Sequence, residues 1–217
     1  MDVLIGTTNP SKVEYFASLL QGCDITFYTL QDLHIRREPE ERGRTPEENA
    51  ILKARFYGKY FDRVICNDFG LYLDALPLQD PRQPGLHVRT PLNLPRLSDE
   101  EMIGYYAQLI RSLGGKVLAY YLNGTAVYHK GRITSFMETI QEGREEAFYM
   151  VDQPAVKRQP GWPLDSLSLD RKTLTYFVDH EDMDEIDRNA SAYYTRLVQF
   201  LKDSLFTTSS PKNAASL

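Results

Sequence analysis

The chain has 217 residues, 25 of them basic and 30 acidic, which gives a formal net charge of -5 at pH 7. Hydrophobic residues make up 42% of the sequence, the usual share for a globular protein, and this excludes a disordered or fibrous chain. A protein that binds duplex nucleic acid normally has a basic excess, so a nucleic acid polymer is not expected as a partner.

The cysteines and the N-terminal residues indicate the expected cellular compartment. Cys23 and Cys66 are too few for a disulfide framework or a four-cysteine zinc site. The N-terminal residues lack the basic and apolar regions of a signal peptide, and no apolar run approaches the ~20 residues of a membrane span. We therefore expect a cytoplasmic protein that has no membrane as a partner.

The first third of the sequence alternates predicted strands and helices. Short apolar runs at 3–5, 25–30 and 63–67 are typical of buried strands. A first helix is predicted to follow Asn9-Pro10, because Asn is a good helix cap and Pro suits the first helical position. A second helix is predicted to begin at Pro46, after a charged loop over 36–46.

The middle of the sequence begins with a predicted excursion and a helix. Several prolines between Pro77 and Pro95 predict a long surface segment without regular structure. Ser98 is followed three residues later by Glu101, a capping-box pattern that predicts a helix.

The rest of the sequence is predicted to be β structure followed by a closing helix. Residues 117–140 are rich in Tyr, Val, Thr and Ile, which favours strands. Turn signals occur at Asn123-Gly124 and again at 129–131, and we favour the later one, because two tight turns would leave very short strands. A last helix is predicted over 187–205.

This order of elements predicts an α/β fold with a central mixed β-sheet flanked by helices. Residues 1–206 are expected to form a single domain, and residues 207–217 a disordered tail. Ligands of such sheets bind beyond the carboxyl ends of strands. Two polar segments, 7–12 and 67–70, follow predicted strands in this way.

The first polar segment, Thr7-Thr8-Asn9-Pro10-Ser11-Lys12, joins a predicted strand to a helix N-terminus. Free backbone N–H groups and the helix dipole favour an anion there, so a phosphate could be held without a glycine-rich loop. The alternative is an ordinary capped helix with a solvated lysine.

Two further segments supply carboxylates. The loop that contains Glu40 could offer oxygen ligands to Mg²⁺, with Lys53 pointing at the same cleft, although a solvated charge run has the same composition. Asp68 closely follows an apolar strand, a position that suits a general base or a metal ligand. The alternative for Asp68 is a turn residue before Gly70.

The single tryptophan, Trp162, lies in a loop braced by proline and glycine, with Asp165 three residues later. Its ring could stack on a nucleobase while the carboxylate accepts hydrogen bonds from the base edge. The alternative is a core anchor beneath a loop. No Ser-His-Asp, Cys-His or metal-binding histidine pattern is present.

Taken in order, these segments resemble the inosine triphosphate pyrophosphatase family. The resemblance rests on residues 7–12, 40–54 and 67–76, followed by Pro84-Gly85 and Arg89. It implies magnesium-dependent hydrolysis of ITP, dITP and XTP to the monophosphate and pyrophosphate. It also implies an elongated, two-lobed α/β subunit with a long central mixed sheet, assembled as a homodimer.

The resemblance implies roles for individual residues. Glu40 and Asp68 would bind Mg²⁺, and Asp68 would also orient or deprotonate the attacking water. Trp162 would stack on the purine, and Asp165 would bond to its edge. Phosphate contacts are implied for polar side chains of the opening segment and for one lysine of the second helix: Thr7, Thr8, Asn9, Lys12 and Lys53.

The sequence departs from the family pattern in three places. Asn67-Asp68 stands where the family usually has two aspartates, and Phe69 would face the substrate where the family has a small residue. The closing motif lacks the family's His-Arg pair: Arg188 would contact phosphate, while Tyr193 and Tyr194 would face the base without a positive charge. An altered base preference is therefore expected. The alternative function is a non-catalytic nucleotide-binding or dimeric interaction protein on the same scaffold.

Overall fold

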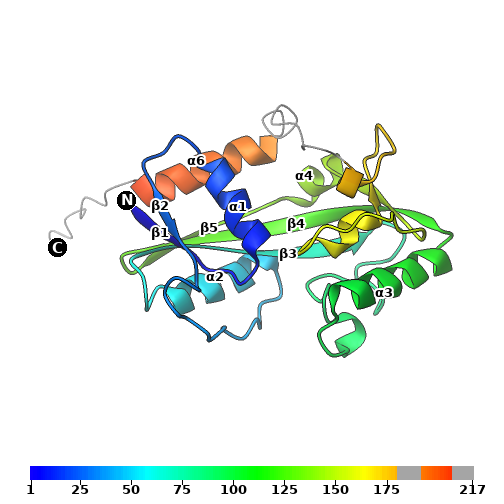
Figure 1. Cartoon of the computed structure of the whole chain (residues 1–217), viewed down its shortest axis with the longest axis horizontal. Coiled ribbons are helices and arrows are strands. Elements are labelled where there is room, and N and C mark those ends of the chain that lie inside the picture. The colour runs from blue at the N-terminus through cyan, green and yellow to red at the C-terminus, as the bar shows by residue number, and fades with distance from the viewer. Residues whose placement is uncertain (180–191, 207–217) are drawn as a thin grey trace, which may run out of the picture.

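The computed structural model of the chain describes residues 1–179 and 192–206. They form an elongated molecule built on one seven-stranded mixed sheet (Figure 1). Its strand order is β2-β1-β3-β4-β6-β7, and β5 also pairs with β4. The predicted α/β fold with a mixed sheet flanked by helices is confirmed. None of the helices in these two ranges has the length and apolar character needed to cross a bilayer.

The elements have the following bounds. The strands are β1 (Asp2–Ile5), β2 (Thr26–Tyr28), β3 (Arg63–Leu73), β4 (Lys116–His129), β5 (Arg132–Met137), β6 (Phe148–Val151) and β7 (Ser168–Leu169). The α-helices are α1 (Pro10–Leu19), α2 (Pro46–Tyr57), α3 (Asp99–Ser112), α4 (Ile140–Glu145) and α6 (Ala192–Phe206). Short 3₁₀ turns occupy Pro91–Asn93, Pro163–Ser166 and Phe177–Asp179.

Two long antiparallel strands, β3 and β4, run through both halves of the molecule (Figure 1). β1 joins β3 in parallel only at Leu4 and Ile5, and then ends. β3 continues past that point, and its edge is next paired at Leu71, which bridges to Gly85. In the described part of the chain no strand covers the edge of β3 between these two places, and the candidate site lies there.

Helices cover both faces of the half that contains β1 (Figure 1). On one face, Ile65 of β3 packs with α1 and α6. On the other face, Val64 and Cys66 pack with Ala50 and Ala54 of α2. This division follows from the alternation of side chains along β3.

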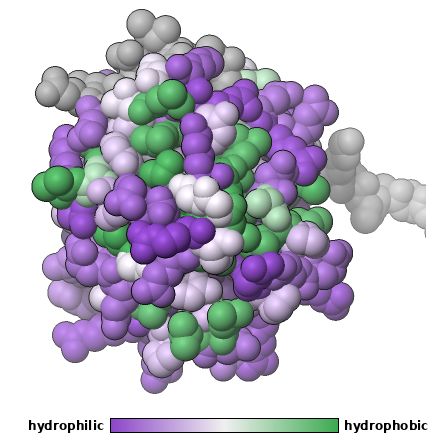
Figure 2. Space-filling model, turned by 90° about the vertical axis from the view of Figure 1, so that its right-hand side faces the viewer, coloured by the Kyte–Doolittle hydropathy of each residue, from purple (hydrophilic) through white to green (hydrophobic). Residues whose placement is uncertain are grey.

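The other half is closed by α3, whose apolar residues Met102, Tyr106 and Ile110 pack on Leu71 and Leu73 of β3. The predicted capping box begins this helix, and both of its hydrogen bonds are present. At this end of the molecule, exposed hydrophobic side chains form small groups separated by hydrophilic ones (Figure 2). Scattered groups of this kind are normal for a protein surface.

The favoured hairpin turn is confirmed, because β4 and β5 are joined by Lys130 and Gly131, both with positive φ. Asn123-Gly124 instead lies inside β4. The β prediction over 117–140 extends too far, because Thr139 caps α4. The predicted start of the closing helix at residue 187 and the predicted tail at 207–217 lie outside the described residues.

Candidate functional site

Asp68 lies at the centre of the site, in the middle of β3 and on the face that α2 covers. It is 9% exposed and lies opposite Gly124 of β4. The prediction that Asp68 follows the end of its strand is wrong, because residues 67–73 continue the ladder with β4. The strand that ends beside Asp68 is β1, so the site still lies where one strand terminates and its neighbour continues.

Helix α2 holds both oxygens of Asp68. The Asn49 side-chain amide donates to Asp68 Oδ2 at 2.8 Å, and Lys53 Nζ donates to Oδ1 at 3.1 Å. Residues four apart on a helix face the same way, so one turn of α2 presents both donors to one carboxylate. Thr45 caps this helix by accepting from the Glu48 N–H, which fixes where that turn begins.

The acidic loop before α2 completes a ring of contacts. Glu41 Oε1 lies 2.8 Å from Lys53 Nζ, and the Gly43 N–H donates to Asn49 Oδ1 at 2.7 Å. The predicted metal ligand Glu40 lies outside this ring, because its side chain is exposed and pairs with Arg42. The structure therefore brings Glu41, and not Glu40, to the lysine beside Asp68.

The region contains two lysines whose pKa values are shifted in opposite directions. Burial alone would lower the pKa of Lys53, but the carboxylates of Asp68 and Glu41 outweigh that effect and raise it. Lys12 is 8% exposed, and burial together with the charge of Lys53 lowers its pKa to about 8. The charges of Asp68 and Glu41 act on Lys12 as well, which places all four groups in one electrostatic neighbourhood.

The opening polar segment forms the predicted capped helix. The Asn9 side chain accepts from the Ser11 N–H at 3.1 Å, and Thr7 Oγ1 accepts from the Asn9 N–H at 3.1 Å. Thr8 is exposed. Lys12 turns inward, and its Nζ lies 4.6 Å from the centre of the Phe69 ring. The structure thus joins the helix N-terminus to the centre of β3 through this lysine.

An aromatic path leads from this lysine towards the tryptophan loop. The Phe69 ring meets Tyr121 edge-on, with 5.4 Å between centroids. Burial raises the pKa of Asp165 to about 7, and the nearby carboxylate contributes to a raised pKa of Tyr121. Asp165 therefore lies next to Tyr121 in a largely apolar environment.

The tryptophan loop itself lies against the opening segment. Ser11 Oγ donates to the Pro160 carbonyl at 3.5 Å. Gly161 has φ +82°, and a Cβ atom there would lie only 3.1 Å from Asn9 Oδ1. Trp162 is half-buried beside this contact. Residues 160–162 therefore lie against residues 9–11, although the two segments are far apart in the sequence.

The predicted base-contacting tyrosines lie at the start of α6. Tyr193 is buried and its ring lies 5.8 Å from that of Phe136. Tyr194 packs edge-on against Tyr15 of α1. The structure places both rings in the core between α1, α6 and β5. Arg188 lies outside the described residues.

Asn67 shows how one departure from the family pattern is accommodated. Its Nδ2 donates to the carbonyls of Asp68 and Gly124, both at 3.2 Å. An aspartate in the same place could not donate to either carbonyl. Asn67 therefore braces the β3–β4 ladder beside Asp68.

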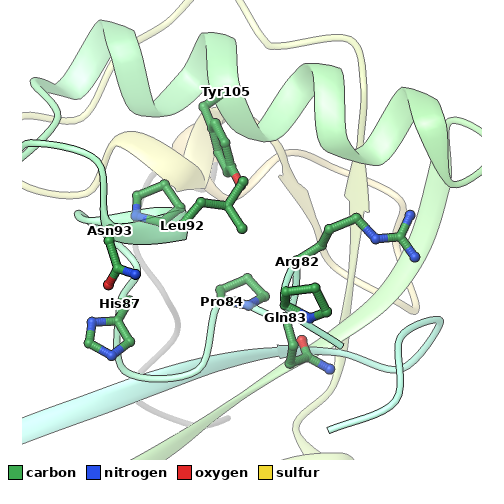
Figure 3. Close-up of a pocket in the computed structure, with 9 residues that line it drawn as sticks. Arg82, Gln83, Pro84, His87, Leu92, Asn93 and Tyr105 are labelled. Atoms are coloured by element: carbon green, nitrogen blue, oxygen red, sulfur yellow. The ribbon is translucent and has the colours of Figure 1, made fainter. Parts of the chain in front are cut away.

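A hollow of about 390 Å³ lies elsewhere, in the proline-rich excursion. Tyr105 of α3 and Leu92 line one side of it, and Gln83, Pro84 and His87 line the other (Figure 3). Gln83 anchors the excursion to β3 by accepting from the Leu73 N–H at 2.7 Å. None of the residues that line this hollow belongs to the Asp68 cluster.

The donor set around Lys53 fits a divalent cation. Asp68 and Glu41 direct carboxylate oxygens at the same nitrogen, at 3.1 and 2.8 Å. Mg²⁺ is usually held by one or two carboxylates together with substrate phosphates, so two carboxylates are enough. Within residues 1–179 and 192–206, no group of three or more His, Cys, Asp or Glu side chains is arranged to hold a metal by itself.

Sequence reasoning missed Asn49 as a site residue. It is 2% exposed and contacts both Asp68 and the acidic loop. The available signal was its position four residues before Lys53 in a helix whose start was correctly predicted. A polar residue on the same face as a proposed phosphate-binding lysine marks that face as part of the site.

Comparison with known proteins adds to this geometry. Residues 3–146 match the Ham1 family profile. The chain is 30% identical over 203 residues to the dITP/XTP pyrophosphatase of Thermoanaerobacter pseudethanolicus, which covers 88% of this chain and 92% of that protein. The fold is similar to that of the Staphylococcus aureus Ham1 protein, with a TM-score of 0.65 and 21% identity over 93% of this chain and 98% of that one. The fold is also similar to that of a HAM1 protein from Coxiella burnetii, with a TM-score of 0.66 and 18% identity over 94% of this chain and 99% of that one.

Proposed function

The chain belongs to the Ham1 family, which confirms the resemblance seen in its sequence, and we propose that it hydrolyses non-canonical purine nucleoside triphosphates such as dITP, ITP and XTP to the monophosphate and pyrophosphate. The observation that carries this proposal is the convergence of Lys12, Lys53 and Asp68 at the end of β1. Two ammonium groups beside a buried carboxylate suit a polyphosphate that water attacks. The name of the similar Thermoanaerobacter protein supports the same activity.

Each residue of this group has a proposed task. Lys12 and Lys53 neutralise phosphate oxygens, with Thr7, Thr8 and Asn9 presenting polar groups at the N-terminus of α1. Asp68 orients a water molecule and accepts its proton as the oxygen attacks the α-phosphorus. The bond from the α-phosphorus to its bridging oxygen then breaks, and pyrophosphate leaves. Arg188, from the part of the chain that is not described, is proposed as an additional phosphate contact.

We propose Mg²⁺ as the metal, held by Asp68 and by a glutamate of the acidic loop. Glu41 is already directed at Lys53, whereas Glu40 would first have to leave Arg42. When bound, Mg²⁺ would neutralise charge that develops on the phosphate oxygens. Lys53 would then be freed from Glu41 to contact a phosphate.

The base is proposed to lie between the opening segment and the tryptophan loop. Trp162 would stack on the purine, Phe69 would line the path to the phosphates, and Asp165 would bond to the base edge. A carboxyl group with a pKa of about 7 is partly protonated at neutral pH and can either donate or accept there. We therefore propose a base preference that differs from that of relatives that carry a His-Arg pair. Tyr193 and Tyr194, at the start of α6, are proposed as further contacts to the base.

A panel of dITP, ITP, XTP, dGTP and dATP, assayed for pyrophosphate release with Mg²⁺, tests the proposal. Turnover of dITP or XTP well above that of dATP is the expected result. Absence of turnover with every triphosphate would contradict it. A homodimer in the cytoplasm belongs to the same proposal, and sedimentation would measure the dimer.

The second candidate is a non-catalytic nucleotide-binding protein. The observation in its favour is Phe69, a bulky ring beside Lys12 where the family has a small residue. Tight binding of dITP without pyrophosphate release would support this candidate, whereas rapid turnover would eliminate it.

A further inference from the structure

We propose that Asn49 is a positioning residue that sets the orientation of the Asp68 carboxylate and couples it to the acidic loop. This inference rests on the proposed function, in which Asp68 acts on water. Asn49 does not reach the substrate in this scheme, because it is 2% exposed and both ends of its amide are already bonded.

The orientation of the Asn49 amide follows from its partners. The Gly43 backbone N–H can only donate, so it requires the amide oxygen. The Asp68 carboxylate can only accept when ionised, so it requires the amide nitrogen. Rotating the amide by half a turn would lose both hydrogen bonds and set the amide oxygen against the carboxylate and the amide N–H against the Gly43 N–H, so a single arrangement is favoured.

The two donors of α2 fix the plane of the carboxylate. Asn49 bonds to Oδ2 and Lys53 bonds to Oδ1, so neither oxygen can move without breaking a hydrogen bond. Lys53 also pairs with Glu41 and is expected to turn towards phosphate when substrate binds. Asn49 is then the contact that continues to hold Asp68 in place.

The same amide links Asp68 to the position of the acidic loop. A Cβ atom at Gly43 would lie 2.6 Å from Asn49 Oδ1, so only glycine allows this approach. Successive contacts therefore run from Glu41 through Lys53, Asp68 and Asn49. They return to the same loop at Gly43. A movement of the loop would be transmitted to the carboxylate through the amide.

Two substitutions separate positioning from a structural role. Asn49→Asp keeps an oxygen for the Gly43 N–H and replaces the donor to Asp68 by a carboxylate oxygen, which repels the Asp68 carboxylate when both are ionised. Asn49→Ala removes both contacts. Gln83→Glu is the matched control, because the Gln83 amide also accepts from a backbone N–H, that of Leu73, and donates to a carbonyl, outside the Asp68 cluster.

We expect both Asn49 variants to lose about 10- to 100-fold in kcat, with KM within about threefold of wild type, because misplacing a catalytic group by an ångström costs about that much. Gln83→Glu should keep kcat within about twofold at a similar loss of melting temperature. Wild-type kcat in Asn49→Asp, or equal kcat losses in Asn49→Asp and Gln83→Glu, would overturn the proposal.

A crystal structure of Asn49→Ala supplies a readout that does not depend on turnover. The Asp68 carboxylate should rotate relative to its wild-type orientation while β3 keeps its register. An unchanged carboxylate would overturn the positioning role even if the wild-type protein is active. An inactive wild-type protein would instead contradict the proposed function and leave this structural result to decide the role of Asn49.

Discussion

Asp68 and Gly124 lie opposite each other in the β3–β4 pair, and the glycine allows α2 to approach the aspartate. A Cβ atom at Gly124 would lie 2.2 Å from the backbone nitrogen of Glu47, inside the first turn of α2. The backbone of this helix therefore contacts the sheet directly beside Asp68. The turn that carries Asn49 reaches the carboxylate because of this close approach.

We expect Gly124→Ala to lower the free energy of unfolding by roughly 1–3 kcal/mol, the usual cost of overpacking, and to lower kcat as α2 is pushed away. Urea unfolding and steady-state turnover would measure the two effects. Gly104→Ala is the control, because Gly104 is exposed in the middle of α3 with nothing within 4 Å, so alanine should stabilise the protein by about 0.5–1 kcal/mol. An unchanged kcat in Gly124→Ala would show that α2 tolerates the displacement.

Asp68→Asn should lower turnover of dITP by roughly 10²- to 10⁴-fold, because the amide cannot accept the proton of the attacking water. Pyrophosphate release measures this effect. Asp152→Asn removes a carboxylate that pairs with the exposed Arg111 outside the site, and it should leave the rate unchanged. If Asp68→Asn turns over at the wild-type rate, the role given to Asp68 is wrong.

Lys12 should make binding depend on pH. Its pKa of about 8 lies below the ordinary value, so the charge that binds phosphate is present below pH 8 and is lost as the pH rises. KM for dITP should therefore rise above pH 8 in the wild-type protein, and Lys12→Arg should keep it low at pH 9. A wild-type KM that stays constant from pH 7 to 9.5 would contradict this.

The same lysine should reduce stability. The folded protein disfavours its charge, and the unfolded chain does not, so Lys12→Met should raise the free energy of unfolding at pH 7 by up to about 3 kcal/mol. The gain should fade between pH 8 and 10.5, where the wild-type lysine becomes neutral in both states. Thermal unfolding of Lys12→Met and of the exposed control Lys202→Met at two pH values would measure it.

The two neighbouring glutamates should differ in their effect on metal use. Glu41 pairs with Lys53, whereas the exposed Glu40 pairs with Arg42. We expect Glu41→Gln to raise the Mg²⁺ concentration for half-maximal activity more than tenfold, and Glu40→Gln to change it by less than about twofold, because one carboxylate ligand to Mg²⁺ is lost only in the first. Calorimetric titration with Mg²⁺ gives a second readout. The reverse order would assign the ligand to Glu40.

Trp162→Ala should mainly raise KM, because stacking on the base acts equally before and during the reaction. The loss should be roughly 1–3 kcal/mol of binding, or about 5- to 150-fold in KM. Tyr60→Ala removes an exposed ring elsewhere and serves as the control. A fall in kcat without a change in KM would place Trp162 in a different role.

Local patterns in the sequence predicted those parts of the fold that local interactions determine. The Asn9 cap, the Ser98 capping box and the turn at 130–131 depend on neighbouring residues, and the structure contains all three. The family resemblance was also visible, because it lies in ordered motifs over the first 90 residues.

The features that local patterns did not predict depend on pairing between residues far apart in the sequence. Asp68-Phe69-Gly70 has the composition of a turn, yet it continues β3 because the longer strand β4 pairs with every residue of β3. Asn123-Gly124 is absorbed into β4 for the same reason. The contact of Glu41, rather than Glu40, with Lys53 and the contacts of Asn49 depend on side-chain packing between the loop, α2 and β3, which no local pattern records.

The length of β3 and β4 also determines how this protein can move. Eleven consecutive residue pairs run unbroken from one half of the molecule into the other, so the two halves share a stiff pair of strands and cannot hinge freely about Asp68. Movement during substrate entry is therefore expected in loops beside Asp68, such as the acidic loop and the tryptophan loop that lies against Asn9. Each of these loops contains a glycine, Gly43 in the first and Gly161 in the second.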